Sequence, residues 1–295
     1  MTKDNYDIVI IGNYTKDTIV SSSGTRNVDG GGFNYGAHVA GMMGLKVATI
    51  TRLAKEDNHV VDALRKNGVD VFPFYSPKST LMKLYYPTSN VDQRVLTVKS
   101  VADPFTQAQV KDMEAKAFLL NASVRGEISL EVIQELRKKN VLIAADLQGF
   151  LRVVAPDGGL HNAAWEEKQE ILSLIDVLKT DAVEGEFLTG ETDIRVQASM
   201  ISDLGPSEIV LSHRNGILVF AEGKYHEAPF SYNKLVGRSG RGDTCIASYI
   251  CKRLSASAEE STIWSAAVTS LKMETEGPIK REIGEVEDHI LKNYQ

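Results

Sequence analysis

Residues 237–251 read GRSGRGDTCIASYIC, and they join a glycine-rich turn to a helical pattern. Three of the first six residues are glycines, whereas Ile246 and Ile250 are spaced four apart, as they would be on one face of a helix. The start of a helix has unpaired backbone N–H groups and carries the positive end of the helix dipole. The stretch therefore predicts a loop-to-helix junction that can bind an anion such as a phosphoryl group.

Asp243 occupies the first turn of this expected helix. A carboxylate at that position also caps a helix, so a purely structural role is the alternative. A cap does not require three glycines before it, but a cradle of N–H groups around a phosphoryl oxyanion does. We predict that Gly240, Arg241 and Gly242 form the anion hole and that Asp243 is the base that takes a hydroxyl proton. The turn is not a Walker A loop, and its Arg-Gly-Asp precedes an apolar helix, unlike an exposed adhesion tripeptide.

Outward from this stretch, short apolar runs alternate with helical patterns along most of the chain. Runs typical of buried strands occupy residues 8–11, 47–50, 117–120, 141–145, 177–178 and 209–211. Helical patterns occupy residues 35–43, 59–66, 129–139, 166–174 and 244–253. This alternation predicts an α/β fold with a mostly parallel central sheet that is covered by helices on both faces.

Two regions break the alternation, at about residues 12–30 and 71–101. Both lack a helical period and contain extended segments, so we expect them to form a small antiparallel β element beside the main sheet. A hairpin with its turn at Asn215-Gly216 is expected near residues 214–230. No Gly/Pro-rich linker divides the 295 residues, and we predict a single domain over residues 1–295.

Charge and composition exclude several classes of protein. The net charge is −6 without a basic stripe, so we expect no nucleic-acid partner. No run of 18 apolar residues is present, so we expect no membrane span. Cys245 and Cys251 are the only cysteines, and the start of the chain resembles a strand rather than an export signal. A reduced, cytoplasmic protein is the resulting prediction.

Residues 29–44, DGGGFNYGAHVAGMMG, contain a second group of glycines. A dinucleotide-binding turn would place these glycines directly after a strand, and the apolar run at 8–11 is too distant. A loop that only caps a helix is the structural alternative. We predict instead that the backbone at Gly31 and Gly32 lies close to a small ligand, with Asn34 and Tyr35 beside it, because glycine lacks a Cβ.

Residues 178–190, LKTDAVEGEFLTG, place Asp181 and Glu184 directly after an expected strand. Ligands of α/β proteins bind at the carboxyl ends of strands. Two carboxylates there suit Mg²⁺, although a solvated helix start explains the spacing equally well.

Together these stretches resemble the ribokinase-like family of carbohydrate kinases, of the phosphofructokinase-B type. An early strand is followed by Gly-x-x-x-x-Asp at Gly12 to Asp17, and a Gly-Gly pair opens a helix that closes at Gly44. Asp181 to Glu184 with Leu188-Thr-Gly190 is similar to the Asn-x-x-Glu and Leu-Thr-Gly of the family. Residues 240–243 are similar to its Gly-Ala-Gly-Asp signature.

The resemblance implies a ribokinase-like fold with a small β-sheet lid and an ATP-dependent kinase that phosphorylates a hydroxyl of a sugar or polyol. Homodimers through the lid occur in such families. The resemblance implies that Asp243 is the base and that Asp17 and the Gly-Gly region contact substrate hydroxyls. It implies that Asp181 and Glu184 organise Mg²⁺ and phosphate, with Glu184 as the metal residue. The residues it implies at the nucleotide are Ser212, Gly216 and Lys272.

The departures from the family pattern concern the substrate. Arg241 replaces a small Ala, Asp181 replaces Asn, and Tyr35 stands where a sugar-contacting Asn is usual. A sugar, a polyol or a nucleoside therefore remains open as the acceptor. A nucleoside kinase would use an aromatic wall, for which Phe72, Phe74, Tyr85 and Tyr86 are the candidates. A sugar-binding protein without catalytic activity is the other alternative. The presence of Asp243 and Glu184 disfavours it, because a binding protein needs neither carboxylate. Arg152 and Arg241 are candidates for phosphate contacts.

Overall fold

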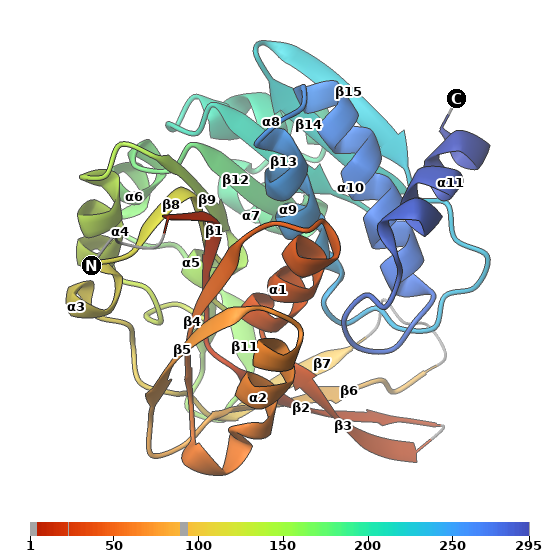
Figure 1. The fold of residues 1–295 in the computed structure, drawn as a ribbon. Helices are drawn as coiled ribbons and strands as arrows, with labels where there is room; N and C mark the ends of the chain where they lie inside the picture. The colour runs from red at the N-terminus through yellow and green to blue at the C-terminus, as the bar shows by residue number, and fades with distance from the viewer. Residues whose placement is uncertain (1–4, 23, 89–93, 295) are drawn as a thin grey trace.

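The structure, a computed structural model, describes residues 5–22, 24–88 and 94–294. Residues 23 and 89–93 fall within the two extended regions noted above and lie outside the described residues. Nine strands form the main sheet in the order β15-β14-β13-β12-β9-β8-β1-β4-β5 (Figure 1). Their bounds are β1 (Asn5–Ile11), β4 (Val47–Leu53), β5 (Asp70–Tyr75), β8 (Glu114–Leu120), β9 (Leu142–Asp146), β12 (Val177–Asp181), β13 (Glu208–Ser212), β14 (Gly216–Ala221) and β15 (Lys224–Pro229).

The main sheet is parallel from β5 to β13, and β14 alone runs in the opposite direction, antiparallel to both β13 and β15. Side chains of a strand point alternately to the two faces of its sheet. In β1, Ile8 and Ile10 therefore join one core cluster, whereas Val9 and Ile11 join the other. A strand covered on both faces must be apolar at every position, which explains the unbroken run in the sequence.

Helices cover both faces of the main sheet, as predicted (Figure 1). One face carries α1 (Gly32–Met42), α2 (His59–Lys66), α9 (Arg241–Arg253), α10 (Ala258–Met273) and α11 (Ile283–Asn293). The other face carries α3 (Gln107–Val110), α4 (Leu130–Arg137), α5 (Gln148–Leu151), α6 (Lys168–Ser173), α7 (Ala182–Thr189) and α8 (Ile194–Ser202). A short 3-10 helix, η1, spans Lys55–Asp57.

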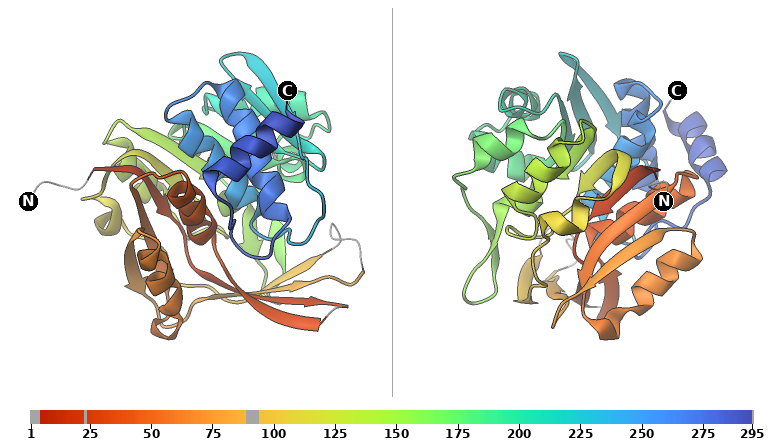
Figure 2. Two further views of the ribbon diagram at one scale, coloured as in Figure 1. Left: turned by 45° about the vertical axis from the view of Figure 1, so that its right-hand side comes forward. Right: turned by 60° about the vertical axis from the view of Figure 1, so that its left-hand side comes forward.

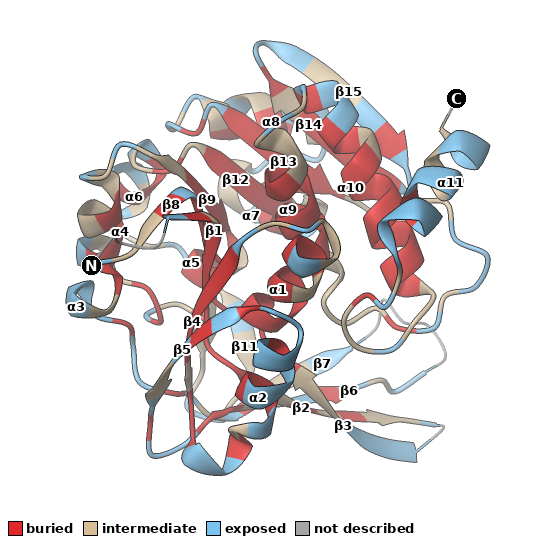
Figure 3. Ribbon diagram, viewed as in Figure 1, coloured by how far each residue is buried: buried red, intermediate tan, exposed pale blue. Residues whose placement is uncertain are grey.

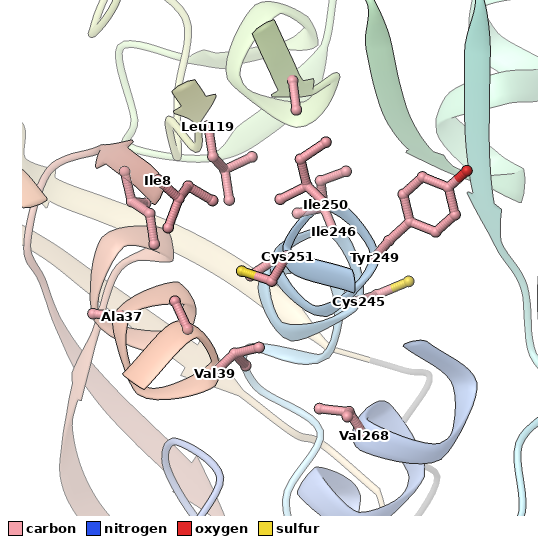
Figure 4. Close-up of a cluster of buried hydrophobic side chains, with 14 of the residues drawn as sticks. Ile8, Ala37, Val39, Leu119, Cys245, Ile246, Tyr249, Ile250, Cys251 and Val268 are labelled. Atoms are coloured by element: carbon pink, nitrogen blue, oxygen red, sulfur yellow. The ribbon is translucent and has the colours of Figure 1, made fainter. Parts of the chain in front are cut away.

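Helix α9 is buried along most of its length between the sheet, α1 and α10 (Figures 3 and 4). Ile246 and Ile250 face the sheet, and Val39 and Val268 lie on the helices beside it. The two cysteines of α9 are buried and form no disulfide. This packing fixes the N-terminus of α9, where the glycine-rich turn is located.

A second, four-stranded sheet projects from the end of the main sheet in the order β3-β2-β6-β7 (Figure 2). Its strands are β2 (Thr15–Ser21), β3 (Gly24–Gly30), β6 (Thr80–Tyr85) and β7 (Val95–Ser100). The short strands β10 (Arg152–Val154) and β11 (Leu160–Asn162) pair with each other, and a single bridge joins Gly159 to Thr97 of β7.

Three sequence expectations need correction. First, β5 pairs with β4 at the edge of the main sheet, where Val71 is buried, so of residues 71–101 only β6 and β7 belong to the small sheet. Second, β2 and β6 are parallel to each other. They follow β1 and β5, which are themselves parallel, and so leave the main sheet in the same direction. Third, Gly216 is the first residue of β14 rather than part of the hairpin turn. No helix of the described ranges is long and apolar enough to cross a membrane.

Candidate active site

A cavity of about 580 Å³ lies between the small sheet and the carboxyl ends of the main-sheet strands. Its lining comes from β2 and β6 on one side, from the ends of β12 and β13 on the other, and from the N-terminus of α9. The carboxyl ends of parallel strands are where α/β proteins bind ligands. The cavity is therefore the candidate active site.

The glycine-rich turn forms one wall of the cavity. Gly240 has a φ of +76° directly before α9, and a Cβ at this position would collide with the ring of Tyr35. A Cβ on Gly242 would lie 2.7 Å from Nζ of Lys179. No side chain caps the start of α9. The turn thus favours glycine at both positions. The N–H groups in the first turn of α9 have no side-chain cap, and they lie beside the buried ammonium of Lys179.

Asp243 lies in the first turn of α9 and lines the cavity. Nε2 of Gln148 lies 3.5 Å from its Oδ1, and the amide of Asn121 is beside it. Burial raises the pKa of the Asp243 carboxyl, and the cations of Lys179 and Arg152 oppose that shift. An elevated pKa makes this carboxylate a stronger proton acceptor than an exposed aspartate.

A buried cluster of charges lies next to the turn. Lys179 of β12 has its Nζ 3.1 Å from Oδ2 of Asp146 and 3.9 Å from Oε2 of Glu184. Arg152 donates from Nη2 to Oε1 of Glu184 at 3.0 Å. Although burial acts to lower it, the two carboxylates raise the pKa of Lys179 above its ordinary value. The lysine is therefore a permanent cation at the anion hole.

Asp181 and Glu184 form a capping box at the start of α7. Oδ1 of Asp181 accepts the N–H groups of Val183 and Glu184, and Oε2 of Glu184 accepts the N–H of Asp181 at 3.0 Å. Both oxygens of Glu184 are thus engaged, because Arg152 holds the other one. Of the two carboxylates only Asp181 lines the cavity, so Asp181 is better placed than Glu184 to contact a metal ion there. Within the described ranges, no group of three or more His, Cys, Asp or Glu residues is arranged to hold a metal.

On the opposite wall, Asp17 of β2 faces the cavity. Its Oδ1 and the side-chain amide of Asn13 are buried without a hydrogen-bond partner among the described residues. Burial is the main cause that raises the pKa of Asp17 to about 6, with a hydrogen bond from Thr15 opposing the shift and the charge of Asp243 adding to it. Buried polar atoms in proteins are nearly always hydrogen-bonded, so this side of the cavity is suited to a hydroxyl-rich ligand.

The other residues that were expected at the substrate differ in their positions. Gly31, Gly32 and Tyr35 line the cavity. Asn34 is buried outside the lining, with its Nδ2 donating to the carbonyl of Asp29 at 3.0 Å. The first three remain candidates for substrate contact, whereas Asn34 holds the preceding turn.

Of the three residues expected at a nucleotide, Ser212 lines the cavity. Gly216 does not, because it is buried in β14 where it pairs with Pro229. Lys272 is fully buried, and its Nζ donates to the carbonyl oxygens of Gly237, at 2.9 Å, and Ser239. These two positions are structural in this arrangement and lie outside the cavity wall.

Several cavity residues were not anticipated from the sequence. They are Arg94, Gln148, Lys179, Arg214 and Arg238. Lys179 has a signal in the sequence, since a lysine directly after the apolar run at 177–178 would need a carboxylate partner if the strand continued through it. Arg238 lies within the glycine-rich stretch 237–251, although no role was expected for it. The other three come from distant parts of the chain, and nothing in their neighbours marks them. Of the aromatic residues suggested for a base-stacking wall, none lines the cavity.

Phosphoryl transfer to an alcohol needs an anion hole, a base and a pocket for the acceptor, and the candidates for all three line this cavity. Combined with the mostly parallel sheet and the small covering sheet, the site defines a small-molecule kinase of the ribokinase-like class. The chain belongs to the pfkB family of carbohydrate kinases, whose model matches residues 6–282. It is a kinase acting on a sugar or polyol.

Three known proteins illustrate the range of similarity. A pyrophosphate-dependent kinase in the ribokinase family, complexed with a pyrophosphate analog and myo-inositol, is 35% identical with a TM-score of 0.87, covering 95% of this chain and 99% of that chain. A cytidine kinase of Thermococcus kodakarensis is 22% identical over 264 residues, 83% of this chain and 87% of that protein. The ribokinase of Arabidopsis thaliana, complexed with ribose and ATP, is 18% identical with a TM-score of 0.76, covering 97% and 99%.

Proposed function

We propose that the chain transfers a phosphoryl group from inorganic pyrophosphate to a hydroxyl of a cyclic polyol such as myo-inositol. The observation that carries this proposal is the charge of the cavity wall. Six arginine and lysine side chains line the cavity against three carboxylates, although the chain as a whole has a net charge of −6. They are Arg94, Arg152, Lys179, Arg214, Arg238 and Arg241.

The choice of pyrophosphate over ATP rests on what the cavity contains beside the turn. Pyrophosphate concentrates its charge in a small volume and needs cations, whereas ATP also needs a surface for adenine. Residues 267–272 of α10, which include the expected nucleotide residue Lys272, are buried and do not line the cavity. Arg241 adds a guanidinium where the family has Ala. The likeness to the pyrophosphate-dependent kinase supports the same choice.

A polyol acceptor is supported by the opposite wall. Asp17 lines the cavity and offers a buried carboxylate oxygen without a partner among the described residues. Met82, Leu84 and Leu96 of the small sheet cover this region. Apart from Tyr35, no Phe, Tyr or Trp of the described residues lines the cavity, so a nucleobase would have little to stack against.

In the reaction, the acceptor oxygen forms a bond to phosphorus while the bond from phosphorus to the bridging oxygen breaks and orthophosphate leaves. Asp243 accepts the hydroxyl proton. The N–H groups of Gly240 and Gly242 and the cation of Lys179 stabilise the charge on the transferred group, whereas the N–H of Arg241 is donated to the carbonyl of Arg238 at 3.2 Å. Mg²⁺ would be held by the donor phosphates and by Asp181, whose Oδ2 is not engaged by its capping bonds, and would neutralise part of the donor charge.

Phosphorus-31 NMR of the purified protein with Mg²⁺, a panel of acceptors and either pyrophosphate or ATP tests this proposal. The panel contains myo-inositol, ribose, fructose and cytidine. We expect a new phosphate monoester and orthophosphate from pyrophosphate with myo-inositol, and none with Asp243→Asn. Faster turnover with ATP would assign the donor to ATP, and turnover of cytidine alone would make the chain a nucleoside kinase. Ligand binding without any transfer would leave only the binding-protein alternative.

A further inference from the structure

Lys272 is a buried cation for which the mechanism above has no use. It lies in the last turn of α10 and is 0% exposed. No carboxylate of the described residues forms an ion pair with it; its Nζ bonds instead to the carbonyl oxygens of Gly237 and Ser239. The same Nζ lies 5.5 Å from the centroid of the Tyr35 ring. Burying an ammonium without a counterion costs free energy, and hydrogen bonds to the two carbonyl oxygens offset part of this cost. The position of these carbonyls therefore depends on the ammonium.

Both partner carbonyls belong to the segment that leads into the anion hole. The N–H groups of Val236 and Gly237 also bond to the carbonyl of Met273, so this segment is held against the end of α10. The ring of Tyr35 lies close to both the Lys272 ammonium and Gly240. The lysine thus sits at the point where α10, α1 and the glycine-rich turn meet.

The geometry of the peptide bond connects this lysine to the cavity. The C=O of Ser239 and the N–H of Gly240 belong to one planar trans unit and point in opposite directions. A bond from Lys272 to the Ser239 oxygen therefore directs the Gly240 N–H away from α10. Lys272 does not line the cavity, whereas Ser239 and Gly240 do. Fixing the carbonyl on one side orients the N–H on the cavity side.

We propose that Lys272 is a positioning residue whose protonated ammonium holds the carbonyls of Gly237 and Ser239 and so orients the anion hole for the phosphoryl group. This inference rests on the function proposed above for residues 240–242. It assigns to Lys272 an action through the backbone, with no contact to donor or acceptor.

A pH dependence follows from the same geometry. Burial lowers the pKa of Lys272 to about 8, with Glu276 and Asp243 opposing the shift and Arg241 adding to it. Tyr35, which also faces the ammonium, has its pKa raised by burial and stays neutral at that pH. Above pH 8 the ammonium loses its proton and holds the carbonyls less firmly, so kcat should fall.

Stability should change in the opposite direction. The folded-state pKa lies below the ordinary 10.5, so between pH 8 and 10.5 the unfolded chain binds more protons through this group. The contribution of Lys272 to the free energy of unfolding therefore rises with pH over this range. If Lys272 served only to stabilise the fold, kcat would not fall over a pH range in which its contribution to the free energy of unfolding rises.

The test compares Lys272→Met, Lys272→Ala and, as a surface control, Lys280→Met. We expect kcat to fall about 10²-fold in both Lys272 variants, as for loss of an oxyanion-hole donor, with the acceptor KM unchanged. Ammonium or methylammonium ions should restore activity to Lys272→Ala in a saturable manner, but not to Lys272→Met, whose side chain fills the space. Lys280→Met should behave as the wild type.

Orthophosphate binding, measured by calorimetry, gives a readout that does not depend on turnover. We expect its Kd to rise about tenfold in Lys272→Met. If the wild type transfers no phosphoryl group, the proposed function fails, and the orthophosphate affinity still decides the role of Lys272. An unchanged affinity with unchanged kcat would overturn this inference. Loss of folding in both variants shifts the test to the wild type, where kcat that stays constant from pH 7 to 10 would overturn it.

Discussion

Lys179 and Asp146 are register partners on the neighbouring strands β12 and β9, and their charged groups meet at 3.1 Å. Both side chains are buried. The Lys179 ammonium lies so close to Gly242 that a Cβ on this glycine would be 2.7 Å from Nζ. The pairing of β12 with β9 therefore holds the Lys179 cation in a fixed position beside the proposed anion hole. No loop has to become ordered to place it there. A preorganised charge of this kind stabilises a transition state more than a mobile one.

Replacing Lys179 by Met should reduce both stability and activity. The variant leaves the carboxylate of Asp146 buried without its cation and leaves Glu184 with Arg152 alone, and we expect the free energy of unfolding to fall by about 3–5 kcal/mol. In the double variant Lys179→Met/Asp146→Asn, urea unfolding should show most of that stability restored. The kcat of the double variant should stay at least about 10²-fold below wild type. Recovery of kcat in the double variant would mean that Lys179 only balances the charge of Asp146.

Asp243→Asn separates the base from a helix cap. Asn has nearly the same shape and still suits a helix start, so the melting temperature should barely move. If Asp243 accepts the proton, single-turnover kinetics should show a fall of about 10²–10⁴-fold. Because burial raises the pKa of Asp243, the wild-type rate should fall with decreasing pH at a higher pH than for an exposed aspartate. A loss of less than about tenfold would remove Asp243 from the reaction.

Arg241→Ala should weaken the donor and spare the acceptor. The guanidinium lines the cavity, with its Cζ 5.7 Å from the centroid of the Phe230 ring. Loss of charge-assisted bonds to phosphate costs about 1–3 kcal/mol, so we expect the pyrophosphate KM to rise about 5- to 150-fold. Arg195→Ala is the matched control, because Arg195 pairs with Glu227 on the surface. Equal kinetics of the two variants would show that Arg241 does not reach the donor.

Asp17→Asn should weaken the acceptor and make its binding independent of pH near 6. Above pH 6 the wild-type carboxylate is ionised and accepts hydroxyl hydrogen bonds, so the acceptor KM should rise as the pH falls below 6. The variant should show a KM about 10- to 100-fold higher at pH 7.5, without this pH dependence.

The stability of the Asp17→Asn variant gives an independent check. The folded-state pKa of about 6 exceeds the ordinary 3.8, so the wild type loses stability as the pH rises through 6. The variant removes that loss and should unfold at a higher temperature than wild type at pH 7.5. Thr18→Ala is the control. Thr18 follows Asp17 in β2, and its hydroxyl donates to Oδ1 of Asn27 on the neighbouring strand β3. A KM equal to that of the control would place the acceptor elsewhere in the cavity.

Local patterns in the sequence were sufficient for the layered fold and for the centre of the site. Strands covered on both faces must be apolar throughout, and residues 8–11 and 117–120 show this directly in β1 and β8. Glycines before a helix, followed by an aspartate, are a short-range signal, and the structure places Gly240, Gly242 and Asp243 together on the cavity wall.

The charge of the cavity and the role of Lys272 depended on contacts between distant segments. Lys179 meets Asp146 only through the register of β12 on β9, and a shift of one residue would turn the lysine to the other face. Lys272 reaches Ser239 across 33 positions of the chain. Arg94, directly before β7, and Arg241, in the first turn of α9, line the same cavity. Hydrophobic patterns determine which face of an element is buried. The choice of polar groups that meet at the end of the sheet depends on how the elements pack, because side-chain contacts between them form only in the folded chain.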